Sequence, residues 1–171
     1  MMIFRFPRLF TALWIFVSLI SFLGISAPHA CAADASPFAA LAGRWTGEGR
    51  LGLKDSSPET VKCRATYFLT DGKDELKQNI RCATAGGTIE ILSVLENAGG
   101  ALTGTWQETT HNIAGGLTGQ VTPSGFRIIV KGSDLAANMD IIFKTGTNQQ
   151  TVEIQFFNSA LTGLTMIMTK G

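Results

Sequence analysis

Residues 63–82 read CRATYFLTDGKDELKQNIRC, and they decide the fold because two alternating runs flank one polar turn. A hairpin that turns at DGKD pairs residues whose numbers sum to 145. This register gives four directly opposed pairs: Leu69 with Leu76, Tyr67 with Gln78, Ala65 with Ile80, and Cys63 with Cys82. One register aligns the largely apolar faces and both sulfurs, which predicts an antiparallel β-hairpin.

The two cysteines of this hairpin are predicted to form a disulfide bond. Directly opposed residues have Cβ atoms about 4.5 to 5.5 Å apart, just above the spacing that a disulfide needs. A redox-active pair is the alternative, but Cys63 and Cys82 lack the Cys-x-x-Cys spacing that lowers a thiol pKa. We therefore expect a structural bond that closes a loop of about 20 residues.

The chain beyond this hairpin alternates in the same way. Residues 33–171 contain 18 Thr, which favour strands, and 18 Gly, which favour turns and bulges. Ten segments are predicted as strands: 44–53, 59–70, 75–84, 87–96, 100–110, 113–122, 125–132, 137–145, 149–157 and 162–169. The short connections favour an all-β fold, a single antiparallel up-and-down β-barrel of about eight to ten strands, with a β-sandwich as the alternative.

A short helical turn is predicted before the first strand. Ser36 suits a helix N-cap, Pro37 suits the first helical position, and Gly43 suits a stop. We assign residues 33–43 to an N-terminal segment that contains this turn, and residues 44–171 to the barrel domain.

The first 32 residues have the pattern of a secretory signal peptide. Arg5 and Arg8 precede a largely apolar run over 9–27, and Ala30-Cys31-Ala32 offers a small-residue cleavage site. An uncleaved membrane anchor is the alternative, because 19 residues can span a bilayer. The pattern predicts a periplasmic or secreted bacterial protein with no membrane span after cleavage.

The charge balance argues against strong nucleic-acid binding. The 171 residues carry 14 basic and 13 acidic side chains, and the 139 residues left after cleavage carry 12 and 13. A near-neutral chain has no basic field to attract a polyanion. A chain of this length can bury a core without a metal or cofactor, so we expect neither.

Side chains suited to catalysis are few. His111 is the only histidine after the signal peptide, and it lies beside Glu108 between two predicted strands. One histidine does not make an ordinary zinc site, and no nucleophile motif stands beside it. We expect a solvated loop histidine, with contact to a ligand as the alternative, and we expect no enzyme.

Several side chains on the predicted inner face are candidates for contact with a ligand. Tyr67, Gln78, Trp106 and Glu108 share the inward parity of their strands, although each could instead belong to a satisfied core. Six small inward residues could leave a cavity or let the walls approach each other: Gly47, Gly49, Ala65, Gly104, Gly115 and Gly119. Of Phe156 and Phe157, one should point inward and the other outward.

The start of the first strand, Gly43-Arg44-Trp45, resembles the G-x-W kernel of lipocalin-like (calycin) barrels. That resemblance implies that Trp45 closes one end of the barrel and that the cup holds a small apolar molecule. In that family an arginine from the last strands stacks on the tryptophan. Residues 149–169 contain no arginine here, and only Lys144 and Lys170 lie nearby in the sequence.

Two further groups share features with this chain. The predicted leader, the G-x-W and the single disulfide are similar to small periplasmic inhibitors of bacterial metalloproteases, whose N-terminal stretch, here 33–38, enters the protease cleft. Three motifs resemble an uncharacterised group of small exported bacterial proteins that carries no activity to transfer. These are G-R-W-x-G from Gly43, C-R-x-x-Y from Cys63, and G-x-W-x-E-x-T from Gly104.

Two functions are therefore expected. The first is the binding of a small apolar ligand by a periplasmic carrier or sensor. The alternative is a protease inhibitor or cell-envelope interaction module that uses the rim loops and residues 33–38. The sequence names neither the ligand nor the partner.

Overall fold

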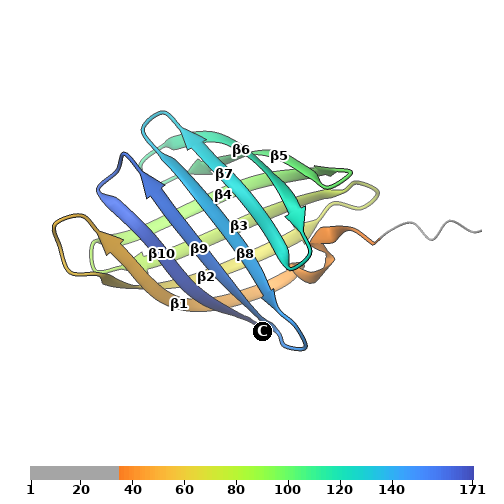
Figure 1. Ribbon diagram of the computed structural model, residues 1–171, viewed down its shortest axis with the longest axis horizontal. Coiled ribbons are helices and arrows are strands. Elements are labelled where there is room, and N and C mark those ends of the chain that lie inside the picture. Colours follow the sequence, from red (N-terminus) through yellow and green to blue (C-terminus); the bar gives the residue numbers. More distant parts are fainter. Residues whose placement is uncertain (1–34) are drawn as a thin grey trace, which may run out of the picture. The chain divides into compact units, whose positions relative to one another are not determined.

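The computed structural model describes residues 35–171, which form a closed antiparallel β-barrel preceded by one short 3-10 helix (Figure 1). The elements are η1 (Pro37–Ala40), β1 (Gly43–Leu53), β2 (Glu59–Leu69), β3 (Glu75–Thr84), β4 (Gly87–Ala98), β5 (Ala101–Glu108), β6 (Ile113–Thr122), β7 (Gly125–Gly132), β8 (Ala136–Lys144), β9 (Gln149–Phe157) and β10 (Leu161–Lys170). The signal peptide and cleavage site predicted within 1–32 lie outside the described residues.

Each strand pairs with its neighbours along the chain, and β1 pairs with β10 to close the barrel. The up-and-down barrel is therefore confirmed, and the β-sandwich is excluded. All ten predicted segments are strands, and their ends differ from the prediction by no more than two residues. The boundaries were predictable because short polar or glycine-containing turns separate alternating runs.

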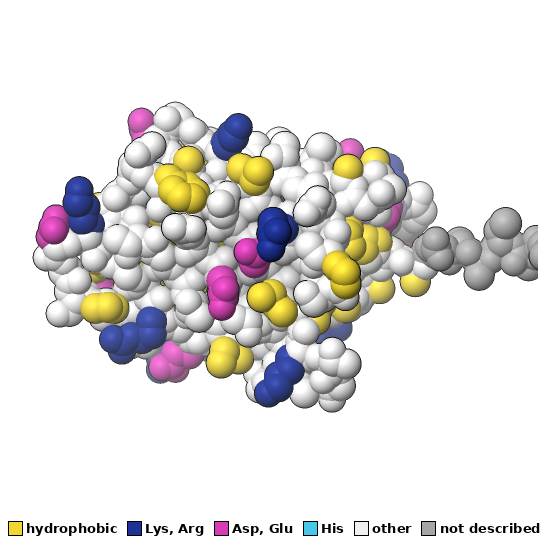
Figure 2. Space-filling model, viewed as in Figure 1, with side chains coloured by type: hydrophobic (Ala, Val, Ile, Leu, Met, Phe, Trp, Pro, Cys, Tyr) yellow, Lys and Arg dark blue, Asp and Glu magenta, His cyan; other side chains and the backbone are white. Residues whose placement is uncertain are grey.

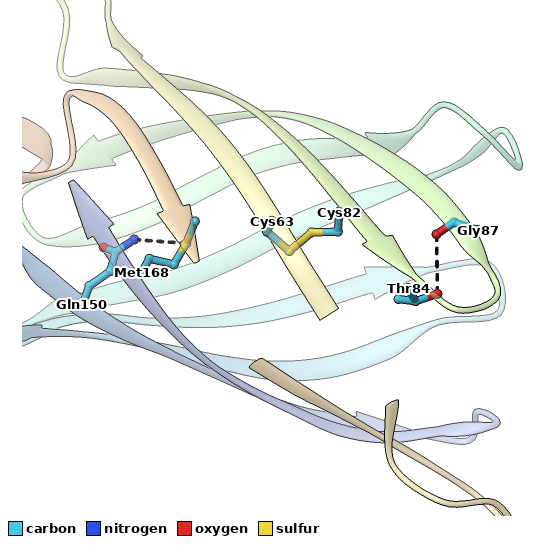
Figure 3. The surroundings of a disulfide bond; sticks show 6 residues. All are labelled: Cys63, Cys82, Thr84, Gly87, Gln150 and Met168. Atoms are coloured by element: carbon cyan, nitrogen blue, oxygen red, sulfur yellow. Dashed lines mark hydrogen bonds between the residues drawn. A yellow bond between two sulfur atoms is a disulfide. The ribbon is translucent and has the colours of Figure 1, made fainter. Parts of the chain in front are cut away.

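The β2–β3 hairpin has the register that the sequence predicts. Leu69 pairs with Leu76 and Cys63 pairs with Cys82. The two cysteines form a disulfide bond with a Cα–Cα distance of 4.1 Å (Figure 3). Both side chains are buried, so the bond joins two adjacent strands from the inner side of the barrel.

The short helix η1 packs at one end of the barrel (Figure 1). The Ser36 side chain accepts a hydrogen bond from the Phe38 amide and donates one to Asp74 in the β2–β3 turn. Phe38 is 1% exposed, and its ring lies 5.6 Å from that of Phe126 on β7. This helical turn therefore fills the end of the barrel with an aromatic side chain.

Trp45 packs at the same end. Its indole N–H donates to the Leu41 carbonyl at 2.7 Å, which ties β1 to the segment that follows η1. The Lys170 ammonium lies 5.8 Å from the centre of the tryptophan ring and donates to the Ala40 carbonyl at 3.2 Å. A lysine on β10 thus occupies the cationic place beside the tryptophan that the lipocalin resemblance assigns to an arginine.

The inward glycines allow neighbouring strands to approach closely. An added Cβ would lie 1.8 to 2.7 Å from a carbonyl oxygen of the adjacent strand at five positions: Gly47, Gly49, Gly104, Gly115 and Gly119. Backbone therefore already occupies the space that a side chain would need. Small inward residues could either leave a cavity or let the barrel walls approach each other. At these five positions the structure shows close approach of the walls.

Two adjacent glycines of β6 provide a test of this interpretation. We expect Gly115→Ala to lower the free energy of unfolding by about 1 to 3 kcal/mol, because the added methyl group would meet the Lys131 carbonyl oxygen at 1.8 Å. Gly116→Ala is the matched control, since its nearest neighbour lies 3.9 Å away. Urea unfolding of both variants checks this, and equal stability of the two would contradict it.

Apolar side chains on the outer surface are scattered. Figure 2 shows hydrophobic groups separated over most of one face by polar and charged side chains. Phe157 is 38% exposed while Phe156 is half-buried, as alternation on β9 requires. Single exposed apolar residues are ordinary, so these positions define no contact surface. Within residues 35–171 no helix is both long enough and apolar enough to cross a membrane.

Candidate functional site

A row of four directly opposed residues crosses the inner wall of the barrel. Tyr67 on β2 pairs with Gln78 on β3, Gln78 pairs with Ser93 on β4, and Ser93 pairs with Trp106 on β5. We call Tyr67, Gln78, Ser93 and Trp106 the polar row. Tyr67 lies near the end capped by η1, whereas Trp106 lies two residues before β5 ends at the opposite end. That opposite end is called the far end.

Two buried polar atoms, one in this row and one on β9, lack a partner. Ser93 is 5% exposed and Gln150, on β9, is 0% exposed. Neither the Ser93 Oγ nor the Gln150 Oε1 makes a hydrogen bond, although the Gln150 Nε2 donates to the Met168 sulfur at 3.7 Å (Figure 3). Buried polar atoms nearly always have a partner in folded proteins, so these two require an explanation.

Tyr67 connects Gln150 to the polar row. Burial raises the pKa of Tyr67 to about 12, and the nearby Gln150 side chain partly offsets that rise. The ring also makes an edge contact with Trp45, with 6.5 Å between ring centres. The phenol is therefore neutral at physiological pH and can donate or accept a hydrogen bond.

The barrel should lose stability at alkaline pH through this tyrosine. The pKa of Tyr67 in the folded protein, about 12, lies above the ordinary value of 10.0. The contribution of the neutral phenol to the free energy of unfolding is therefore complete below pH 10 and is lost as the pH rises through 12. The loss should reach roughly 2 to 3 kcal/mol. Tyr67 is the only tyrosine, so tyrosinate absorbance measures it directly. A midpoint near 10 in the folded protein would contradict this, and Tyr67→Phe is the control for unfolding.

Trp106 already has a partner for its polar atom. Its indole N–H donates to the Lys131 carbonyl at 3.2 Å, and the side chain is 7% exposed. The benzene ring of the indole also lies where a Cβ on Gly132 would sit, which fixes its position against β7. Trp106 can therefore offer a ligand an apolar surface, while its N–H is committed to the barrel wall.

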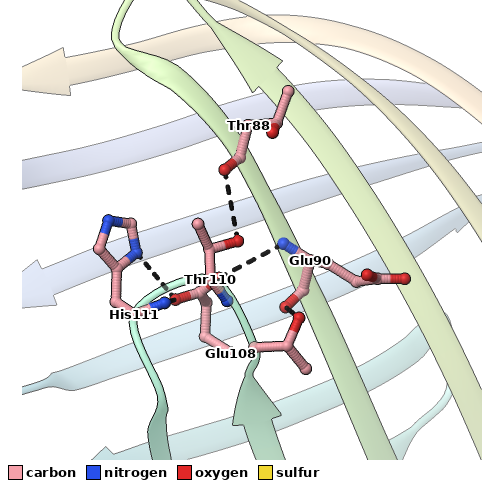
Figure 4. A network of polar contacts seen from close by, with 6 residues as sticks. Thr88, Glu90, Glu108, Thr110 and His111 are labelled. Atoms are coloured by element: carbon pink, nitrogen blue, oxygen red, sulfur yellow. Dashed lines mark hydrogen bonds and ion pairs between the residues drawn. The ribbon is translucent and has the colours of Figure 1, made fainter.

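Glu108 holds the β5–β6 turn (Figure 4). Its carboxylate accepts hydrogen bonds at 2.7 Å from the amides of Thr110 and His111, and at 2.9 Å from the His111 Nδ1. Burial alone would raise the pKa of Glu108, but these hydrogen bonds outweigh it and hold the pKa at about 2. His111 itself lies on the exposed turn, with a side chain that is 64% exposed.

The far end of the barrel carries apolar side chains that remain half-buried although they follow the inward parity of their strands. These are Ile91, Val130, Met139, Ile154 and Leu164. At the η1 end, by contrast, Phe38, Leu76 and Leu102 are almost completely buried. Two inward side chains at the η1 end, Val121 and Phe143, are also half-buried. The two ends therefore differ in the number of such side chains and in the aromatic plug that η1 supplies.

The structure places the four predicted contact residues in different situations. Tyr67, Gln78 and Trp106 lie side by side in the polar row, whereas the Glu108 carboxylate turns to the β5–β6 turn. Ser93 and Gln150 are not among the residues that the sequence predicts. Each is a polar residue at an inward position of an otherwise apolar alternation, which is a signal visible in the sequence. Gln150, for example, shares the inward face of β9 with Val152. No cluster of His, Cys, Asp or Glu in residues 35–171 suits a metal ion.

Comparison with known proteins shows the fold. No protein-family model matches the chain, and no curated protein matches it. The crystal structure of Rv2717c from M. tuberculosis is similar with a TM-score of 0.65 and 14% identity, over 80% of this chain and 98% of that one. The S-type phycobiliprotein lyase CPES from Guillardia theta is similar with a TM-score of 0.59 and 12% identity, over 78% and 90%.

Both neighbours share the antiparallel β-barrel, which fits a lipocalin-like calycin architecture. At these identities the likeness concerns the fold, and it assigns no family and no residue role.

Proposed function

We propose that this chain is an exported protein that binds one small, largely apolar molecule through the far end of its barrel, without catalysis. The observation that carries the proposal is the larger set of inward apolar side chains that stay half-buried at the far end, where no η1 plug fills the barrel. The η1 end is filled by Phe38, which is 1% exposed. At the far end, Ile154 and Leu164 stay half-buried although they point inward. A concave apolar surface with a few polar groups is the usual form of a small-molecule site.

Two other observations support the proposal. The polar row and Gln150 place unsatisfied polar atoms inside an otherwise apolar barrel, as a ligand site requires. One of the structural neighbours is described as a phycobiliprotein lyase, which is in keeping with a barrel that takes a small ligand. The disulfide fits an oxidising compartment, which agrees with the export predicted from the leader.

Nile red, an uncharged apolar dye, tests the proposal. We expect it to bind the mature protein with a stoichiometry of one. Leu164→Gln should weaken binding about tenfold, because an amide would replace apolar surface inside the barrel. Ile167→Gln is the matched control on the same strand, since Ile167 points outward and is 57% exposed. Binding without a fixed stoichiometry, or equal weakening by both variants, would contradict the proposal.

The interaction-module alternative is less well supported. A protease inhibitor of the expected kind would need residues 33–38 as a free wedge. Phe38 is instead buried in the barrel, and Ser36 is bonded to Asp74. Deleting 33–38 should therefore destabilise the fold, whereas the wedge hypothesis expects the fold to be spared.

A further inference from the structure

We propose that the ligand carries an uncharged polar head with a hydrogen-bond donor, which the polar row and Gln150 hold inside the barrel. This inference rests on the proposed function and adds the chemical class of the ligand: a largely apolar molecule that ends in an alcohol or an amide N–H, rather than in a carboxylate, a phosphate or an ammonium group.

The first step concerns the two unpartnered atoms. The Gln150 Oε1 accepts hydrogen bonds only, and the Ser93 Oγ can accept or donate. Both side chains are more than nine-tenths buried, so bulk water does not satisfy them. A ligand head with an O–H or N–H would give the Gln150 oxygen the partner that the protein does not provide.

The second step is that these two atoms belong to one connected set. Ser93 is directly opposite Gln78, and Gln78 is directly opposite Tyr67. The Gln150 side chain lies close enough to the Tyr67 phenol to lower its pKa. Directly opposed inward side chains have Cβ atoms about 4.5 to 5.5 Å apart, so neighbouring members of the set are within reach of one small polar group. The apolar part of the ligand would extend from this set toward the far end.

The third step concerns charge. Among residues 35–171 the only buried charged side chain is Glu108, and no lysine or arginine is buried. An anionic head would thus lose its water without gaining a cation, and it would meet a negative side chain. An ammonium head would find the Glu108 oxygens already engaged by Thr110 and His111. A neutral head avoids both penalties.

Competition against bound Nile red measures the head-group preference. Three unbranched compounds of similar length differ at the head: decan-1-ol has a neutral donor, 1-methoxydecane has no donor, and decanoate at pH 8 is an anion. We expect decan-1-ol to displace the dye at a concentration about tenfold lower than either of the other two. Equal potency of the three, or displacement by none of them, would overturn the inference and leave Nile red binding intact. Failure of Nile red itself to bind would overturn the proposed function as well.

Ser93→Ala separates recognition from folding. The substitution removes a buried hydroxyl that has no partner, so the folded protein should be as stable as the wild type or more stable. The same variant should lose most of the preference for decan-1-ol over 1-methoxydecane, and Gln150→Leu should do likewise. Thr105→Val, on the exposed outer face of β5, is the control and should keep the preference. Retention of the preference in both Ser93→Ala and Gln150→Leu would overturn the inference.

Discussion

Replacing Phe38 with alanine is expected to lower the free energy of unfolding by about 3 to 5 kcal/mol, the usual cost of truncating a buried phenylalanine. Phe38 is 1% exposed and packs against Phe126, whose ring in turn contacts Phe143 at 5.7 Å. The truncation would leave a space between these rings and the helical turn that the barrel cannot easily close. Urea unfolding, followed by circular dichroism, gives the change directly.

Phe68→Ala provides the control for this prediction. Phe68 points outward from β2 and is 57% exposed, so its loss should change stability by less than about 1 kcal/mol. A Phe38→Ala variant as stable as Phe68→Ala would show that η1 does not fill the end of the barrel. The proposed difference between the two ends would then lose its basis.

The second large effect belongs to the disulfide. Replacing both Cys63 and Cys82 with alanine should lower the free energy of unfolding by about 3 kcal/mol, because the unfolded chain would no longer contain a closed loop. Unfolding of the wild type with and without a reductant should show a shift of similar size. The double variant is the control, since a reductant should not change its unfolding midpoint. Free thiols in an oxidised protein of residues 33–171 would contradict the bond.

The fold could be predicted because each level of the sequence points to the same arrangement. The register of the β2–β3 hairpin is fixed by a short polar turn, by the two cysteines and by the apolar parity of Leu69 and Leu76, which agree with one another. A slip of one residue would move every one of these side chains to the wrong face. The strand segments could be located because turns recur between alternating runs.

The candidate site was less predictable, because it depends on which strands face each other across the barrel. Ser93 falls opposite Gln78 through neighbouring pairings, but Gln150 reaches Tyr67 from β9, which is far away in the sequence. Alternation alone also cannot tell an inward glycine that leaves space from one that admits a neighbouring backbone. At Gly115 an added Cβ would lie 1.8 Å from the Lys131 carbonyl oxygen, which shows that the neighbouring backbone fills the space.

The contact between Glu108 and His111 illustrates a different limit. The two residues are neighbours in the sequence, and its inward parity makes Glu108 one candidate for contact with a ligand. The turn instead brings two amides and the imidazole onto one carboxylate, which the short spacing from 108 to 111 makes possible. A local hydrogen-bonding demand at the end of a strand therefore competes with the inward direction that alternation assigns.

The indole N–H signals in a ¹H–¹⁵N correlation spectrum test the central claim most directly. Residues 33–171 contain two tryptophans, Trp45 beside η1 and Trp106 toward the far end, so a protein of these residues should give two signals. On titration with decan-1-ol, the Trp106 signal should shift in a saturable manner with one equivalent bound, and the Trp45 signal should shift less. Unchanged positions of both signals, or a larger shift of Trp45, would contradict a barrel that is filled at the η1 end and receives its ligand from the other.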